Sequence, residues 1–548
     1  MNNNKDKKIL FFGTVGIVIV IAVVIISLAT KIVAPKDQSL ESLLKKVNVK
    51  QAEPKKASIT LSNAALYDEL PDINKYPLAV EGNADLNIEI FTSGEKGGAG
   101  SDSWLVTCAQ NFNKMDFRTT DGKSVNLSVR SISSGLGADY IISRKYLPDL
   151  YTPSNELFGE YAKVNGGVLT LQTERLVGNT AGILIKKDST LNSVDDIINS
   201  VTNGTLNLGY TNPQTSATGL NLLIYILTNN GGIDSEKASA YFSSFNNNIP
   251  FVAYTTQQMR DSASNGSLDG MVTEYQAYIN DTNLTSQYNF LPFGMRHDNP
   301  LYVVDAANKS AGESEAIQLI SDYLLSDEAQ SIADSCGFNE NDSYQYDMNV
   351  TGIDINKSLE VYKSKKDSGK DIIAVFVADC SGSMNGEPIL ELKSSLSNGM
   401  NYINENNYVG LVSYATDVTV EVPIAKFDMT QKSYFQGALN SLVANGNTSS
   451  YEAVCVGLDM ILNAKKDHPD AKCMLFLLSD GYATGDYSLS TIKSAVKKSG
   501  VPIYTIGYGY DADMAALGDL SKFNEAAAIS ADSEDIVYKI KSLFNAQL

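Results

Sequence analysis

Short apolar runs alternate with amphipathic stretches along most of this 548-residue chain. From residue 86 to about 345 the apolar runs have the length of strands, and the stretches between them have helical spacing. This alternation predicts an α/β architecture with largely parallel sheets. Strands are predicted at Leu86–Phe91, Val125–Val129, Val168–Leu171, Ala181–Ile185, Leu206–Tyr210, Gly270–Val272 and Leu301–Val304, and helices at Ser103–Asn113, Ser193–Ser200, Thr218–Thr228, Ser235–Phe245, Thr256–Asn265 and Glu313–Cys336.

The same alternation starts again after a polar, charged segment that ends near Lys370. About 180 residues of this kind predict a second, doubly wound α/β domain. Its predicted strands are Asp371–Ala378, Tyr408–Tyr414, Cys473–Leu478 and Pro502–Gly507, and its predicted helices lie near Ile389–Met400, Gln431–Leu442, Tyr451–Ala464, Ser490–Ser499 and Asp532–Asn545. The predicted division of the chain is residues 1–30 for a tail and membrane anchor, 31–84 for a stalk and lead-in segment, 85–345 for the first α/β domain, 346–370 for a linker and 371–548 for the second.

The N-terminal anchor is predicted from Ile9–Ala29, an uncharged apolar run that follows three lysines. About 21 residues in a helix span a bilayer core of roughly 30 Å, and the lysines place the short tail in the cytoplasm. A cleaved signal peptide is the alternative, with Ser27-Leu28-Ala29 as its cleavage site. In either case the bulk of the chain is expected outside the cytoplasm, and with the anchor retained the protein is single-pass at the cell membrane.

Composition narrows the function classes. The formal net charge is −20, which argues against a nucleic-acid partner. The chain has only two histidines and five cysteines without a close-spaced pair, so neither a histidine-based catalytic centre nor a zinc or disulfide framework is visible. No nucleophile motif or paired-acid arrangement appears either, and we therefore expect a protein that is not an enzyme.

A candidate metal site lies in the second domain. Asp379, Ser381 and Ser383 follow its first strand, Asp480 follows a later strand, and Thr448 lies in a polar loop. Sites in doubly wound sheets form at the carboxyl ends of the strands, so these residues are expected to meet there. Two carboxylates and three hydroxyls are hard ligands that suit Mg²⁺, with Mn²⁺ or Ca²⁺ as alternatives. A helix-capping turn with unused hydroxyls is the simpler interpretation.

This set resembles the metal-ion-dependent adhesion site of the von Willebrand factor A (VWA) domain, over Asp379-x-Ser381-x-Ser383, Thr448 and Asp480-Gly481. The resemblance implies that the two serines and the threonine ligate the cation directly and that the aspartates often act through water. It also implies a protein partner whose acidic side chain takes an open ligand position. Asn445-Gly446-Asn447 departs from the consecutive glycines that many members have before the threonine.

Residues 86–345 resemble a bacterial extracellular solute-binding protein of the type II periplasmic class, which has two α/β lobes joined by crossing strands. The loops that carry the resemblance are Thr92–Gly98, Ser133–Asp139 and Tyr210–Gly219, together with the stretch Ser321–Phe338. Hydroxyls and backbone N–H groups at helix N-termini bind anions, although the same residues also serve as simple caps. Candidate cleft residues are Ser93, Ser134, Thr215, Ser216, Thr218 and Glu274, while Glu95 and Glu274 would disfavour an anion if they faced the cleft.

Two functions follow from this organisation. The first is a membrane-anchored extracellular binding or adhesion protein of bacterial type, whose VWA domain captures a partner through a divalent cation. The second is a solute receptor for import or sensing, in which the two-lobed domain takes a small solute and the VWA domain docks another component.

Overall fold

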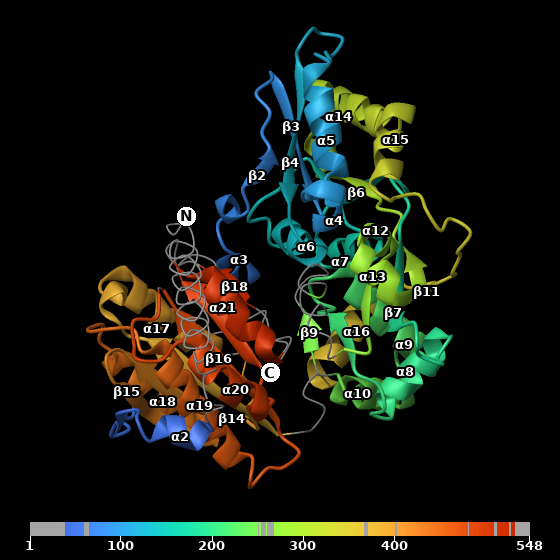
Figure 1. Ribbon diagram of the computed structural model, residues 1–548. Helices are drawn as coiled ribbons and strands as arrows, with labels where there is room; N and C mark the ends of the chain where they lie inside the picture. Colours follow the sequence, from blue (N-terminus) through green and yellow to red (C-terminus); the bar gives the residue numbers. More distant parts are fainter. Residues whose placement is uncertain are drawn as a thin grey trace, which may run out of the picture.

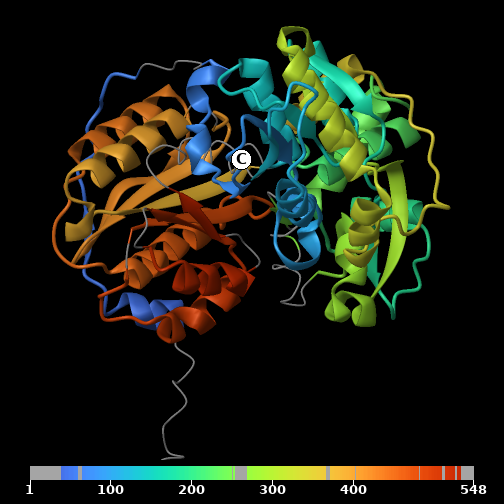
Figure 2. The same cartoon turned by 90° about the horizontal axis from the view of Figure 1, so that it is seen from above.

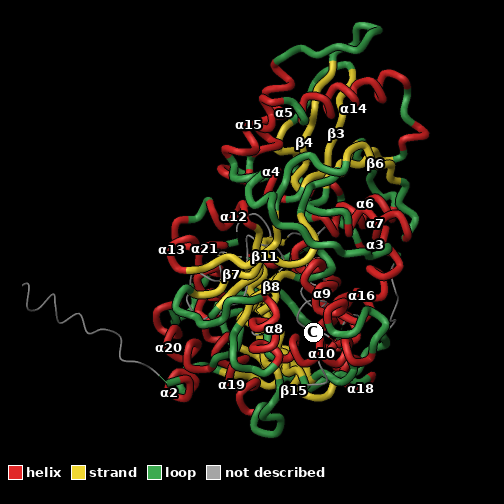
Figure 3. Tube along the Cα trace, turned by 90° about the vertical axis from the view of Figure 1, so that its right-hand side faces the viewer, coloured by secondary structure: helices red, strands yellow, loops and turns green. Residues whose placement is uncertain are grey.

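The computed structural model describes residues 39–59, 65–249, 251–253, 259, 268–365, 371–400, 403–480, 482–508, 512–524 and 528–531. Within these residues the strands form sheets of six, five and seven strands, with helices packed outside them (Figures 1 and 3). The first two sheets are the centres of two lobes, and the third is the centre of the C-terminal domain, which lies beside them (Figure 2). The predicted α/β class is confirmed.

The first lobe has a six-stranded sheet in the order β2-β4-β3-β5-β12-β6. β3 pairs in parallel with β4 and β5, and their loops therefore leave from one edge. The helix predicted over Glu313–Cys336 is two helices, because Ser326 caps the second by accepting a hydrogen bond from the backbone N–H of Ala329. The elements are β2 Leu78–Val80, β3 Leu86–Thr92, β4 Val125–Ser131, β5 Leu150–Thr152, β6 Leu169–Thr173 and β12 Leu301–Val304, with helices α3 Leu66–Glu69, α4 Gly94–Gly97, α5 Trp104–Lys114, α6 Ser134–Ser143, α7 Leu157–Val164, α14 Ala311–Leu324 and α15 Asp327–Ser335.

The second lobe has a five-stranded sheet in the order β11-β7-β10-β8-β9. β10 lies between antiparallel β7 and parallel β8. The helix predicted over Thr256–Asn265 lies outside the described residues apart from Met259. The elements are β7 Thr180–Lys186, β8 Leu208–Thr211, β9 Phe251–Ala253, β10 Gly270–Glu274 and β11 Tyr288–Arg296, with helices α8 Val194–Thr202, α9 Ala217–Asn229, α10 Glu236–Asn247, α12 Tyr275–Ile279, α13 Thr282–Gln287 and α16 Gly352–Lys365.

Two of the segments that connect the lobes, after β6 and after β11, are hydrogen-bonded to each other. The backbone N–H of Asn179 donates to the carbonyl of His297 at 2.9 Å, and the N–H of His297 donates to the carbonyl of Asn179 at 3.0 Å. Both side chains are buried. The crossing is therefore a short two-stranded ladder at the base of the cleft between the lobes.

The C-terminal domain has a seven-stranded sheet in the order β1-β15-β14-β13-β16-β17-β18. β13 is the central strand and is entirely buried, which matches its unbroken apolar sequence. β15 was not predicted from the sequence, and it is the antiparallel partner of β14. The elements are β13 Ile372–Asp379, β14 Tyr408–Tyr414, β15 Val418–Lys426, β16 Lys472–Ser479, β17 Ile503–Tyr508 and β18 Ala528–Ala531, with helices α17 Glu387–Gly399, α18 Met429–Ser441, α19 Ser450–Ala464, α20 Leu489–Ser499 and α21 Met514–Ser521.

Part of the segment expected to be a stalk belongs to the C-terminal sheet instead. β1 (Val49–Gln51) pairs in parallel with β15, and Lys50 makes a 2.6 Å ion pair with Asp417. The preceding helix α2 (Leu40–Leu44) packs against α19 and α20 (Figure 1). Leu43 is fully buried there among apolar residues of this domain. Leu43 is the one buried position among residues 39–59, and all three residues of β1 are exposed, which agrees with the mostly polar sequence of this segment.

The segment expected to be a linker is also largely structured. α16 forms the middle of this segment and packs against α7, α9 and α10 of the two-lobed domain. Its residues Ile355 and Tyr362 are fully buried. The part of the chain that leads from the two-lobed domain to β13 is therefore much shorter than the 25-residue linker expected at 346–370.

The predicted membrane anchor, Ile9–Ala29, lies outside the described residues. Within the part of the chain that the structure describes, no helix has the length and apolar character needed to cross a bilayer.

We expect Leu43→Ala to lower the free energy of unfolding of the C-terminal domain by about 2–5 kcal/mol, because the substitution leaves a cavity in a packed core. The matched control is Leu390→Ala on α17, where the side chain is 63% exposed and the cost is within about 0.5 kcal/mol. Urea unfolding followed by fluorescence measures both. Equal midpoints for the two variants would show that residues 39–57 are a stalk after all.

Candidate functional site

The carboxyl edge of the C-terminal sheet brings the predicted metal-binding residues together. β13 and β16 pair in parallel and in register as far as Ala378 and Leu478. Directly beyond this edge Ser381 Oγ lies 3.0 Å from Ser383 Oγ, and Ser383 Oγ donates to Asp480 Oδ1 at 3.0 Å. Three of the five predicted residues thus form one hydrogen-bonded chain of side chains.

Asp379 is hydrogen-bonded to the Ser381 end of this series of side chains. Its Oδ1 accepts from the backbone N–H of Ser381 at 2.8 Å, while Oδ2 accepts from the hydroxyls of Tyr414 at 2.9 Å and Ser479 at 3.1 Å. Burial raises the pKa of Asp379, and the hydrogen bonds from Ser381, Tyr414 and Ser479 oppose that shift. A buried carboxylate supported only by neutral donors is a suitable anchor for a cation.

The fifth residue, Thr448, lies on a loop that is attached to the first one. The N–H of Gly382 donates to the carbonyl of Gly446 at 3.0 Å, and the N–H of Asn445 donates to the carbonyl of Cys380 at 2.8 Å. Gly446 has a φ of +74°, which a residue with a side chain adopts only with strain. Thr448 is itself buried, and its backbone is hydrogen-bonded to Thr484. The structure thus places the threonine loop beside the serine loop.

The ligand chemistry of this edge suits a hard divalent cation. Its side chains offer carboxylate and hydroxyl oxygens, which Mg²⁺ and Ca²⁺ prefer. The neighbouring Cys380 is a poor soft ligand because burial raises the pKa of its thiol to about 12 and keeps it protonated. Among the described residues no cluster of three or more His, Cys, Asp or Glu side chains is placed to hold a metal, so any cation here would depend on the serine and threonine hydroxyls.

A second candidate site is a cavity of about 270 Å³ between the two lobes. Residues 93–95 and 131–134 reach it from the first lobe, and residues 215–218 and 274 reach it from the second. The lobes touch at its rim, where the N–H of Gly135 donates to the carbonyl of Thr215 at 3.1 Å. All six predicted cleft residues line it: Ser93, Ser134, Thr215, Ser216, Thr218 and Glu274.

The six residues differ in what their side chains do. Ser216 is a helix cap, because its hydroxyl accepts from the N–H of Gly219 at the start of α9. The hydroxyl of Ser93 makes no such cap and instead takes part in a charged network. Thr218 donates to Glu274 at 3.1 Å. The capping interpretation therefore holds for Ser216, while Ser93 and Thr218 bind carboxylates.

A buried ion pair lies at the first-lobe side of the cavity. Lys96 is 0% exposed, and its Nζ lies 3.6 Å from Glu95 Oε1. It also donates to Ser93 Oγ at 2.7 Å and to Asn299 Oδ1 at 2.6 Å. Burial raises the pKa of Glu95, but the charge of Lys96 and the hydroxyls of Ser154 and Ser93 outweigh it, so the pKa lies below its ordinary value. Glu95 is thus held ionised.

Several residues of these sites were not found from the sequence. Tyr414 is the last residue of β14 and Ser479 is the last residue of β16, and these two strands flank β13. Their position at the end of a strand is the signal that could have indicated them. Lys96, Asn179 and His297 support the cavity from beneath its lining. They carry no local signal, because their partners are far away along the chain.

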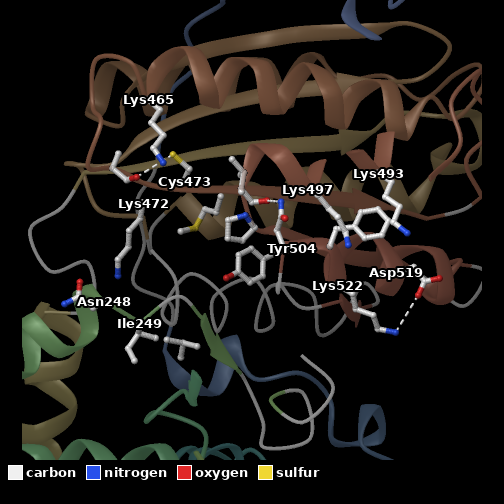
Figure 4. A pocket seen from close by; sticks show the side chains of 18 of the residues that line it. Asn248, Ile249, Lys465, Lys472, Cys473, Lys493, Lys497, Tyr504, Asp519 and Lys522 are labelled. Carbon is white, nitrogen blue, oxygen red and sulfur yellow. Dashed lines mark hydrogen bonds and ion pairs between the residues drawn. The ribbon is translucent and has the colours of Figure 1, made fainter. Parts of the chain in front are cut away.

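A wider hollow of about 1130 Å³ separates the second lobe from the amino ends of β16 and β17 (Figure 4). Asn248 and Ile249 face it from the lobe, and Tyr504 faces it from the sheet (Figure 4). A hydrogen bond crosses between the domains here, from Lys472 Nζ to the carbonyl of Asn246 at 3.2 Å. The chain as a whole is acidic, but this hollow is basic, because the C-terminal domain contributes Lys465, Lys472, Lys493, Lys497 and Lys522 to its lining.

Comparison with protein families decides what the two domains are. Residues 374–545 match the von Willebrand factor type A domain, and residues 105–339 match the bacterial extracellular solute-binding protein family. The chain joins a solute-binding domain to a VWA domain. The predicted resemblances to a VWA domain and to a bacterial extracellular solute-binding protein are thereby confirmed. The VWA match includes the candidate metal-binding edge, and the solute-binding match includes most of the two lobes.

Individual relatives are distant. The inter-alpha-trypsin inhibitor heavy chain H3 of Mus musculus is 26% identical over 165 residues, which are 28% of this chain and 18% of that protein. A von Willebrand factor A domain-containing protein of Dictyostelium discoideum is 29% identical over 182 residues, or 31% of this chain and 18% of that protein. The chain therefore spans about a fifth of the length of these curated relatives.

Solved structures are similar to each domain separately. A von Willebrand factor type A protein from Catenulispora acidiphila has a TM-score of 0.30 at 17% identity and covers 32% of this chain and 42% of its own. The sulfate-binding protein SubI from Mycobacterium tuberculosis H37Rv has a TM-score of 0.35 at 14% identity, covering 47% and 88%. A periplasmic thiamin binding protein has a TM-score of 0.40 at 11% identity, covering 52% and 98%.

We expect Lys96→Met to lower the free energy of unfolding of the solute-binding domain by roughly 3–5 kcal/mol, because it leaves the Glu95 carboxylate buried without its cation. The double variant Lys96→Met/Glu95→Gln should recover most of this loss. Lys163→Met, which removes a half-exposed ion pair with Glu160, should cost no more than about 1 kcal/mol. Thermal unfolding measures all three, and a Lys96→Met variant no less stable than Lys163→Met would refute the buried pair.

Proposed function

We propose that this protein is an extracellular binding or adhesion protein whose VWA domain binds a partner through a divalent cation. The observation that carries the proposal is the chain from Ser381 through Ser383 to Asp480, anchored beside the buried Asp379 at the sheet edge. These side chains are hydrogen-bonded to one another. Asp379, Ser381, Ser383, Thr448 and Asp480 would hold the ion, and Mg²⁺ is the ion proposed, with Mn²⁺ and Ca²⁺ as alternatives.

The donor set also supports a role for the partner. Two carboxylates and three hydroxyls leave an octahedral ion short of ligands, so that water fills the remaining positions. A carboxylate from a partner protein can replace such a water, and the Asp480 side of the site is the more exposed one. Binding of this kind needs no general base, and the proposed role is binding without turnover.

We also propose that the protein is held at the cell surface by Ile9–Ala29. The support is the length of this uncharged run and the lysines before it. The solute-binding family is extracellular by its description, and this agrees with a chain whose bulk lies outside the cytoplasm.

A second candidate function is a solute receptor for import or sensing, with the VWA domain as a docking module. The observation that favours it is the cavity between the lobes, which is lined by side chains from both and bounded by the contact from Gly135 to Thr215. Lobes that close on a ligand change their separation when it leaves. The two functions are compatible, because the sites lie in different domains.

The metal proposal is tested by thermal unfolding of the protein with and without Mg²⁺ after treatment with a chelator. Mg²⁺ at 100 times its dissociation constant should stabilise the VWA domain by about 2.7 kcal/mol. Asp480→Asn should abolish this stabilisation, because it removes a charged ligand.

The matched control is Asp470→Asn, an exposed carboxylate just before the opposite end of β16, which should leave the response to Mg²⁺ unchanged. The proposal fails if neither Mg²⁺, Mn²⁺ nor Ca²⁺ stabilises the unsubstituted protein, or if Asp480→Asn responds as Asp470→Asn does.

A further inference from the structure

The cavity between the lobes has an acidic lining. Glu95, Asp102 and Glu274 contribute carboxylates to it, and the rest of the polar lining is hydroxyls. Among the described residues that line it, none is a lysine, arginine or histidine. Asp102 accepts a hydrogen bond from Gln276 across the cleft at 3.0 Å. A site of this composition repels small anions, although anions are what loops at helix N-termini usually attract.

Glu274 is the carboxylate that decides the charge of the cavity. Its Oε1 accepts from Thr218 at 3.1 Å and lies 2.7 Å from His297 Nδ1, while Oε2 accepts from Asn179 Nδ2 at 2.9 Å. Three donors on one carboxylate favour its ionised form. The nearest buried cation, Lys96, is bound instead to Glu95, Ser93 and Asn299.

The histidine beside Glu274 is a neutral donor. The amide of Asn221 is oriented by the backbone of Met295, because its Nδ2 donates to that carbonyl at 2.7 Å and its Oδ1 accepts from that N–H at 2.9 Å. Asn221 Nδ2 therefore faces His297 Nε2 at 3.4 Å as a donor, which makes Nε2 an acceptor. The ring proton is then on Nδ1 and is donated to Glu274.

The amide of Asn179 is oriented in the same way. Its Oδ1 accepts from the N–H groups of Thr180 and Gln276, so Nδ2 must face Glu274. All three hydrogen bonds to Glu274 thus come from neutral groups, and none of them cancels its charge. Ser133 adds a buried hydroxyl on the lining that has no hydrogen-bond partner within the described residues.

We propose that this cavity binds a small organic cation that carries a protonated amine, with Glu274 as its counter-ion and the hydroxyls of the lining as further acceptors. This inference rests on the second proposed function, a solute-binding two-lobed domain, and names its ligand class. The volume of about 270 Å³ is below the roughly 300–1,000 Å³ of drug-sized sites, which limits the ligand to a small molecule. The ammonium group replaces the missing positive charge, and hydroxyl oxygens accept its remaining N–H groups.

Ligand binding and the hinge are linked in this arrangement. Asn179 and His297 exchange a pair of backbone hydrogen bonds between the crossing segments, and their side chains both donate to Glu274. A cation that pairs with Glu274 therefore contacts the group that joins both crossings. The closed arrangement of the lobes is therefore also the state in which a bound cation compensates the charge of Glu274.

The test uses matched pairs of probes on the full chain, read by thermal unfolding and by calorimetry. Putrescine is compared with 1,4-butanediol, and glucosamine with glucose, because each pair differs in its ammonium groups. We expect the amines to stabilise the two-lobed domain, and the neutral partners and sulfate or molybdate to have no effect. Stabilisation by a neutral partner equal to that by its amine, binding of either anion, or no response to any amine overturns the proposal.

Glu274→Gln should weaken amine binding by about 30-fold or more, since it removes a buried counter-ion. The matched control is Glu340→Gln, an exposed side chain in the loop after α15, which should bind the amine as the unsubstituted protein does. The response of the VWA domain to Mg²⁺ is recorded in the same samples. If Mg²⁺ does not stabilise the VWA domain of the unsubstituted protein, the metal site is refuted and the amine result still stands. The two proposals therefore fail separately.

The pH dependence gives a measurement that needs no variant. Burial and the charge of Glu95 raise the pKa of Glu274, while the hydrogen bond from His297 and the charge of Lys96 oppose the shift. Protonation removes the counter-ion, so amine affinity should fall as the pH falls through this raised pKa, and amine binding should release protons. An amine affinity that is constant or rises as the pH falls, with no proton release in calorimetry, contradicts the role of Glu274.

Discussion

In-register pairing of parallel strands is the constraint on which both sites depend. β13 and β16 keep register as far as Ala378 and Leu478, and the carboxylates of Asp379 and Asp480 therefore leave the sheet at one edge. β3 and β4 keep register as far as Thr92 and Ser131 in the first lobe, and the loops that follow reach the cavity. A polar residue that directly follows a buried strand therefore lies at the same sheet edge as the polar residue that follows a neighbouring parallel strand.

This constraint explains why so much of the candidate sites could be predicted from the sequence. Central strands are continuous apolar runs, and the residue after each run can be identified without knowing the fold. The edge strand β1 and its neighbour β15 were missed because they are more exposed and more polar than the central strands. Lys96 was missed for a different reason. Its sequence context resembles that of a surface lysine, and its burial depends on Asn299, 203 residues further along the chain.

The order of the elements along the chain decides how the two domains are connected. β1 joins the VWA sheet before the solute-binding domain begins, and β13 returns to that sheet after α16. The solute-binding domain is therefore inserted between two strands of the VWA sheet and is attached to it at both ends. A change in one lobe would act on the VWA domain through two connections, and a basic hollow separates the two domains at the second lobe (Figure 4).

The central claim is that a hard divalent cation binds where Asp379, Ser381, Ser383, Thr448 and Asp480 meet. Anomalous diffraction from crystals grown with Mn²⁺ tests it most directly, because the ion is located without reference to any assumed site. The account predicts an anomalous peak within coordination distance of the Ser381 and Ser383 hydroxyls, with a ligand position open to solvent or filled by an acidic side chain of a neighbouring molecule. A well-ordered sheet edge with no peak there would contradict it.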